Sequence, residues 1–167
     1  MSEKEMIRQL AKTTRQWRER ALRDIFEVGT VDLSYRPTTG MSSLGWLIAH
    51  QAAVFDFSLN HLLQKKSPIN PELFKAHLPG TTGDWSGASL DEMNRYYDEC
   101  ESALLDWVDK CEPADFERVI DDEDIPKFFR GMTVLEIFSN MFIHLNHHNG
   151  HLSAIKGDIL TKHDVQI

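Results

Sequence analysis

Apolar residues recur along this chain at steps of three or four positions, the spacing that places side chains on one face of an α-helix. Segments with this pattern cover residues 3–28, 44–64, 90–111 and 134–157. In the first segment the predicted core positions are Met6, Leu10, Thr13, Trp17, Ala21, Ile25 and Val28. No stretch alternates apolar and polar residues clearly enough to predict a sheet. The pattern therefore predicts an all-α fold, a four-helix bundle.

Residues that favour helix ends support these boundaries. Ser89 with Glu92, and Thr133 with Glu136, have the spacing of a capping box, in which each side chain accepts a hydrogen bond from the other residue's backbone N–H. We therefore expect the third and fourth helices to begin at these positions. Gly157 is expected to end the fourth helix, because glycine is common just past a helix C-terminus.

The segment between the second and third predicted helices, residues 65–88, is long, and proline and glycine interrupt it repeatedly. Long loops of this kind often cover a functional site. With 167 residues, 41% of them apolar, the chain can bury one hydrophobic core. The expected organisation is therefore a single domain over residues 1–167, a bundle with long connecting loops.

The formal net charge of the chain is −8, from 18 basic and 26 acidic residues. No segment gathers Lys or Arg into a stripe that could follow a phosphate backbone, so nucleic acid is not an expected partner. The basic residues of the first predicted helix, Arg15 and Arg18 among them, are interleaved with acidic ones. Such mixing is typical of a solvated helix face.

The N-terminal residues lack the apolar core of a signal peptide, and no window approaches the roughly 20 apolar residues that cross a bilayer. We therefore expect a cytoplasmic protein with no membrane partner. Cys100 and Cys111 fall on one predicted helix, about 16 Å apart along its axis, which exceeds the reach of a disulfide. They are expected to be reduced thiols in the core.

Histidine is concentrated in the fourth predicted helix, where His144 and His148 stand four positions apart. That spacing places two imidazoles one helical turn apart, within reach of a common ion. A complete site needs a further ligand from elsewhere in the fold. His50 is the best candidate, because it lies alone in the apolar run from Leu44 to Ala53, where an imidazole needs a polar partner. The sequence therefore predicts a metal site formed by His50, His144 and His148.

Other interpretations of the histidines stay open. His50 could be a core histidine bonded to a backbone carbonyl, and the His-rich helix could be an exposed one. His147 and His151 lie on the same side of that helix as the predicted ligands, so either could contact substrate or support the ligands from outside. Of these two, His147 is the better candidate for a bystander. The remaining histidines have no such context and are expected on the surface or in loops: His61, His77 and His163.

Imidazole ligands define the chemistry of the predicted site. Because three neutral imidazoles add no charge, a divalent ion would keep its +2 charge and an open coordination position. Such an ion attracts anions, lowers the pKa of bound water toward neutrality and binds a thiol as the reactive thiolate. The ligand type favours Zn²⁺ first, and imidazole also suits Ni²⁺, Fe²⁺ and Cu²⁺.

Residues 36–50 and 144–152 resemble the motifs of the DinB-like (DinB/YfiT) metal-binding four-helix bundles. In that family a serine-capped second helix carries one histidine, and the fourth helix carries His-x-x-x-His followed by Arg-Gly-Gln. The metal ligands that the resemblance implies are His50, His144 and His148. Asn149 stands where the family commonly has arginine, and His151 where it commonly has glutamine.

The resemblance also implies a function. Relatives in the family look like thiol S-transferases and isomerases that use bacillithiol, mycothiol or glutathione. It therefore implies a metal-dependent transferase that acts on a low-molecular-weight thiol and a small electrophile, in a homodimer. Two alternatives remain, a non-catalytic stress-associated metal-binding or interaction protein and a metal-dependent hydrolase. The hydrolase needs a general base, for which Glu136, two helical turns before His144, is a distant candidate.

Overall fold

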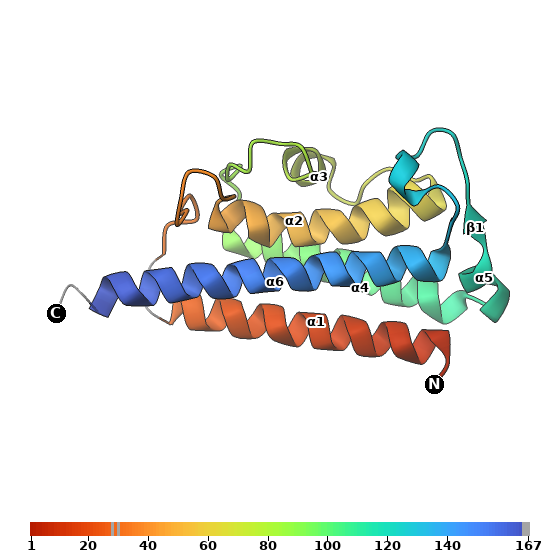
Figure 1. Ribbon diagram of the computed structural model, residues 1–167, viewed down its shortest axis with the longest axis horizontal. Coiled ribbons are helices and arrows are strands. Elements are labelled where there is room, and N and C mark those ends of the chain that lie inside the picture. Colours follow the sequence, from red (N-terminus) through yellow and green to blue (C-terminus); the bar gives the residue numbers. More distant parts are fainter. Residues whose placement is uncertain (28, 30, 165–167) are drawn as a thin grey trace.

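Four long helices form the body of the protein (Figure 1). The computed structural model describes residues 1–27, 29 and 31–164, with side chains through residue 162. The long helices are α1 (Glu3–Phe26), α2 (Leu44–Asp56), α4 (Leu90–Lys110) and α6 (Val134–Asp164). Each packs against two of the others, which confirms the predicted all-α bundle. Within the described part of the chain, no helix combines the length and apolar character that a bilayer crossing requires.

Short elements occupy the links between the long helices. They are α3 (Pro71–Ala76), α5 (Pro113–Glu117), the 3₁₀ turn η2 (Lys127–Phe129), β1 (Val119–Ile120) and β2 (Met132–Thr133). The two strands pair antiparallel, with Val119 opposite Thr133. The prediction of no sheet was therefore wrong in this detail. Strands of two residues each are too short to show the alternation by which a strand is recognised in a sequence.

The helix boundaries follow the predicted caps at the N-terminal ends. The Ser89 side chain accepts a hydrogen bond from the backbone N–H of Glu92, and the Glu92 carboxylate accepts one from the backbone N–H of Ser89. The predicted end at Gly157 was wrong, because α6 continues to Asp164. Ile159 lies beyond the glycine and is buried in the core. Burial of that side chain outweighs the cost of about 1 kcal/mol that glycine brings to a helix interior.

The second predicted helix extends to residue 64, as expected, but its last part changes geometry. After α2 the chain continues as the π-helix η1 (Phe57–Gln64), which ends at Lys65 in the left-handed conformation. At the junction, the buried carboxylate of Asp56 accepts hydrogen bonds from the hydroxyl of Tyr96 and the backbone N–H of Ile69, at 2.7 and 2.8 Å. This carboxylate therefore ties the start of the long link to α4.

The core consists of two apolar clusters that a layer of buried polar residues separates. On α1, α2 and α6 alike, the apolar residues of one cluster give way to buried polar positions before the other cluster begins. The polar layer contains Thr14, Arg18, His50, Gln51, His148 and Asn149. The predicted metal site therefore lies at the level where the core is polar.

The predicted core face of the first helix was wrong in register from Met6 to Trp17, whereas Ala21 and Ile25 are buried as predicted. Trp17 is 53% exposed, whereas Arg18, expected on a solvated face, is 4% exposed. The buried positions are Ile7, Ala11, Thr14, Arg18, Ala21, Leu22 and Ile25. These keep alternating steps of four and three, whereas the predicted seam took three successive steps of four, which drift around a helix. Val28, the last predicted core position, lies outside the described residues.

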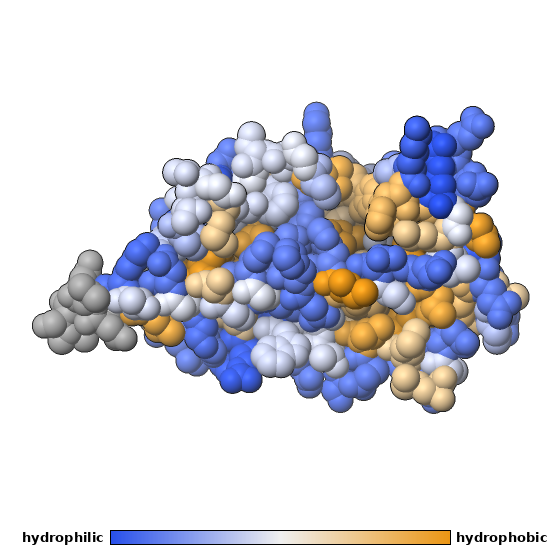
Figure 2. All heavy atoms as spheres, in the orientation of Figure 1, coloured by the Kyte–Doolittle hydropathy of each residue, from blue (hydrophilic) through white to orange (hydrophobic). Residues whose placement is uncertain are grey.

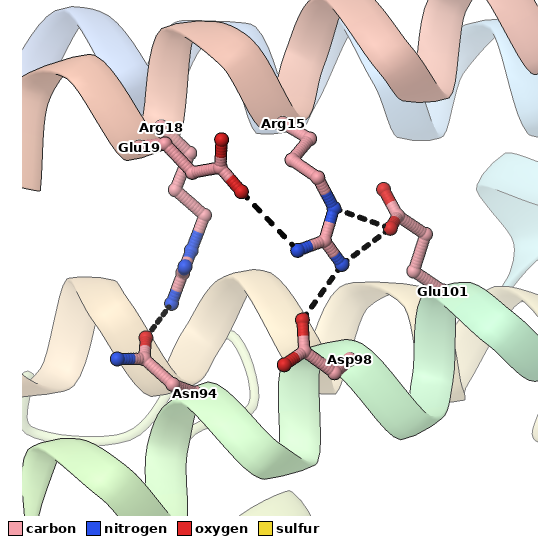
Figure 3. A network of polar contacts seen from close by, with 6 residues as sticks. All are labelled: Arg15, Arg18, Glu19, Asn94, Asp98 and Glu101. Carbon is pink, nitrogen blue, oxygen red and sulfur yellow. Dashed lines mark hydrogen bonds and ion pairs between the residues drawn. The ribbon is translucent and has the colours of Figure 1, made fainter.

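Arg18 and Arg15 connect α1 to α4 (Figure 3). Arg18 donates to the side-chain oxygen of Asn94 at 2.8 Å, and its guanidinium lies 4.2 Å from the centre of the Tyr97 ring. Arg15 pairs with Glu101 and with Asp98 on α4. The arginines therefore hold two helices together, where the sequence predicted a solvated face.

Both cysteines are buried and free of disulfide bonds, as predicted. Burial raises the pKa of the Cys100 thiol, and it raises the pKa of the Cys111 thiol to about 11. Both side chains are therefore protonated at neutral pH, in the form that is a poor nucleophile.

Candidate metal centre

Three histidines from two helices converge inside the bundle. His50 lies in the middle of α2, and His144 and His148 lie one turn apart in the middle of α6. The Nε2 atom of His144 is 3.0 Å from Nε2 of His50 and 3.0 Å from Nε2 of His148. One nitrogen from each of the three imidazoles lies within 4.8 Å of the others, and the group could hold a metal ion. The structure thus brings together the residues that the sequence predicted to meet.

The orientation of the His50 ring is fixed by two neighbours. Its Nδ1 lies 2.5 Å from the backbone carbonyl oxygen of His77, which can only accept a hydrogen bond. Nδ1 therefore carries the proton, and Nε2 directs a lone pair toward the other two imidazoles. Trp46 stacks on the ring at 4.2 Å between centroids, and the Trp46 indole N–H donates to the hydroxyl of Thr81.

The electrostatic environment keeps these imidazoles neutral. Burial lowers the pKa of His50 to about 4 and that of His148 to about 2, and it also lowers the pKa of His144. The hydrogen bond from His50 to the His77 carbonyl opposes this effect without reversing it. At neutral pH the three rings are therefore in the form that binds metals.

The donor set fits a divalent cation better than it fits mutual hydrogen bonds. Since Nε2 of His50 has no hydrogen, a single N–H on Nε2 of His144 cannot serve both 3.0 Å contacts with good geometry. A cation accepts a lone pair from each ring at once. Imidazole nitrogens bound to one zinc ion at about 2.0–2.1 Å must lie within about 4.2 Å of one another, and both contacts of His144 satisfy this limit.

Side chains next to the histidines lock α2, α6 and α1 together. Gln51 donates to the side-chain oxygen of Asn149 at 2.7 Å, and Asn149 donates to the backbone carbonyl of Thr14 at 3.1 Å. Gln51 follows His50 in the sequence, and Asn149 follows His148. These hydrogen bonds therefore fix how far the two histidine-bearing helices can slide or rotate against each other.

A family model of the DinB superfamily matches residues 9–152. The chain belongs to the DinB superfamily. The match contains the three converging histidines and confirms the family that the sequence motifs indicated. A comparison with curated proteins gave no match.

At the position where the DinB superfamily commonly has arginine, this chain has Asn149, and its buried side chain points between helices. We expect Asn149→Ala to lower the free energy of unfolding by about 1–3 kcal/mol, because it removes the bond to Thr14 and leaves the buried amide of Gln51 with only a 3.5 Å contact to the Leu145 carbonyl. Urea unfolding of the metal-free protein measures this effect.

The matched control is the next residue, Gly150, which is exposed and has no atom within 4 Å of the position of an added Cβ. Gly150→Ala should preserve or raise stability by up to about 1 kcal/mol, the difference in helix propensity. If Asn149→Ala unfolded at the same urea concentration as the unchanged protein, the polar layer would have no such role.

The other histidines of this DinB-superfamily chain differ in position. His147 is exposed and His151 is half-buried, and their rings lie 4.3 Å apart between centroids. His61 is exposed, as predicted. His77 lies in the long link just after α3, as predicted for a loop residue, but it is fully buried and its carbonyl holds His50. The side chain of His163 lies outside the described residues.

A cavity of about 640 Å³ adjoins the histidine group on one side of the DinB-superfamily bundle. Its walls come from α2, η1, α6, the link before α4 and the segment around η2, and they include both His144 and His147. The long link contributes Leu78 and Pro79. Trp85 of the same link does not line this cavity and packs on Gly45. No sequence pattern predicted that the segment around η2 forms part of this cavity wall.

Proposed function

We propose that this protein binds a divalent metal ion through His50, His144 and His148 and uses it to transfer a low-molecular-weight thiol to an electrophile. The observation that carries the proposal is the convergence of the Nε2 atoms, together with the hydrogen bond that leaves Nε2 of His50 free to bind a metal. Imidazole ligands favour Zn²⁺, ahead of Ni²⁺ or Fe²⁺.

A cation held there would supply Lewis acidity, which favours the deprotonated form of a nearby thiol. In the proposed transfer, the sulfur forms a bond to an electrophilic carbon, and the leaving group departs with the electron pair of the bond that breaks. The thiol proton passes to a base. His147 lines the cavity and is exposed to solvent, so its imidazole is placed to accept that proton and release it to water.

Two observations favour the transferase over the alternatives. A metal-dependent hydrolase needs a general base, but the candidate Glu136 is occupied as the N-terminal cap of α6, where it accepts from the backbone N–H and hydroxyl of Thr133. These hydrogen bonds lower the pKa of Glu136, which weakens it as a base. A non-catalytic metal-binding protein needs no substrate cavity, yet a cavity of about 640 Å³ borders His144.

A cobalt-substituted protein tests the proposal. Protein purified without an affinity tag is stripped of metal, loaded with Co²⁺ and titrated with cysteine or glutathione while the visible spectrum is recorded. We expect the thiols to shift the cobalt bands, because a thiol that reaches the ion changes its ligand field. Serine, which replaces the thiol of cysteine by a hydroxyl, is the matched control and should leave the spectrum unchanged.

A cobalt spectrum that thiols leave unchanged would contradict the transferase and leave metal binding without thiol chemistry. Absence of any cobalt spectrum would contradict the metal site itself. Loss of the spectrum in His50→Ala links the signal to the converging histidines.

A further inference from the structure

The cavity beside the histidine group has an apolar wall. Aromatic and aliphatic side chains from separate segments face it, among them Phe57 of η1, Phe129 of η2 and Ile143 of α6. Its volume of about 640 Å³ lies within the range of about 300–1,000 Å³ that is typical of small-molecule sites. Figure 2 shows hydrophobic residues gathered on this face, over α6 and the segment that carries η2. The space is therefore suited to an organic molecule with little polarity.

The cavity has polar groups at only a few points, and two of these are imidazoles. His144 belongs both to the converging histidines and to the cavity wall, and His147 lies one turn of α6 from Ile143. The other polar side chains in the wall are those of Ser58 and Asn140. A molecule that fills the cavity therefore has one end at His144 and the rest of its body against apolar side chains.

Charge decides which of the two reactants this cavity suits. None of the described residues that line it is Asp, Glu, Lys or Arg. Thiols such as glutathione carry carboxylates, and a carboxylate buried without a cationic partner costs several kcal/mol or more. Away from the histidine group, the cavity therefore suits uncharged parts of a molecule.

We propose that the cavity binds the electrophile of the transfer and selects neutral, apolar molecules with an aromatic or aliphatic body. The identification of the ligand as an electrophile rests on the proposed function. The preference for neutral apolar ligands rests on the cavity alone. The reactive carbon lies at the His144 end. The thiol approaches the histidine group from outside the apolar wall.

Two exposed residues at the rim allow a test that spares the core. Phe128 is 65% exposed and Ile143 is 70% exposed, and both line the cavity. The probe is N-phenyl-1-naphthylamine, a neutral aromatic molecule that fluoresces when it enters an apolar site. We expect it to bind the metal-free protein, in which no cation at the histidine group attracts anions, and we expect Phe128→Glu and Ile143→Glu each to weaken binding tenfold or more, because the new carboxylate lies where the apolar body packs.

Val119→Glu is the matched control, since Val119 is 56% exposed and does not line the cavity. It makes the same change in charge and should leave probe binding unchanged. The anionic analogue 8-anilino-1-naphthalenesulfonate, which has the same aromatic rings, should bind at least tenfold more weakly than the neutral probe. The cobalt spectrum of each variant shows whether the histidine group is intact.

The outcomes separate this inference from the proposed function. Equal probe affinity in the rim variants and the control, or equal affinity for the neutral and anionic probes, would overturn the inference even if thiols shift the cobalt spectrum. Conversely, a probe that responds to both rim variants would uphold the neutral apolar site even if thiols leave that spectrum unchanged.

Discussion

Replacing His148 with alanine is expected to remove the metal ion, whereas the same change at His147 should leave metal content near that of the unchanged protein. Nε2 of His148 lies 3.0 Å from that of His144 inside the bundle, but His147 is exposed and does not belong to the group of converging nitrogens. Loss of an outer-shell partner alone lowers metal affinity by about 10- to 100-fold, so loss of a ligand should lower it by more than about 100-fold.

Elemental analysis of tag-free protein and a competition titration with a chromophoric chelator measure this effect. Circular dichroism shows whether each variant keeps its helices. His61→Ala removes a second exposed histidine far from the site and should also retain metal. Equal loss of metal from His147→Ala and His148→Ala would mean that the α6 histidines act together as an exposed cluster and not as a defined ligand pair.

The metal-free protein is expected to lose stability steeply as the pH falls below about 6.5. In the folded state the pKa values of His50 and His148 are lowered to about 4 and about 2, so both rings stay neutral at pH 5. In the unfolded chain they take up protons below their ordinary pKa. Because the unfolded state takes up protons that the folded state does not, lowering the pH below about 6.5 favours the unfolded state. The free energy of unfolding is therefore highest above about pH 6.5 and decreases below it.

The expected loss approaches about 1.4 kcal/mol per pH unit for each histidine, and between pH 6 and pH 5 it is about 2.4 kcal/mol for both. Urea unfolding in the presence of a chelator, at pH 7, 6 and 5, measures it. The double variant His50→Gln/His148→Gln should unfold with a much weaker pH dependence. A pH dependence that is the same in the variant and the unchanged protein would show that other groups titrate on unfolding.

Local sequence patterns were sufficient to predict the bundle and the pairing of His144 with His148. The spacing of His144 and His148 is a property of one helix, and the apolar run around His50 marks a buried segment, so neither requires knowledge of the fold. The buried face of α1 was harder to predict, because Trp17 and Arg18 are neighbours. Apolarity favours burial of Trp17, whereas Arg18 is the buried residue. Burial of Arg18 depends on Tyr97 and Asn94, which belong to a helix about 80 residues away.

The cavity and the contact of His77 could not be predicted from single segments. The cavity forms where Phe129, between the two short strands, approaches α6 and η1, and no local periodicity describes that approach. His77 acts through its backbone carbonyl, a group that every residue has. The continuation of α6 past Gly157 depended on the packing of Ile159, which outweighed a reliable local stop signal.

The backbone carbonyl of residue 77 accepts the hydrogen bond from His50. The tautomer of the His50 ring therefore depends on the path of the backbone and not on the side chain at position 77. Substitutions at residue 77 that keep this path preserve the orientation of the imidazole. Comparing residue types alone would therefore overlook a contact that holds the site in order.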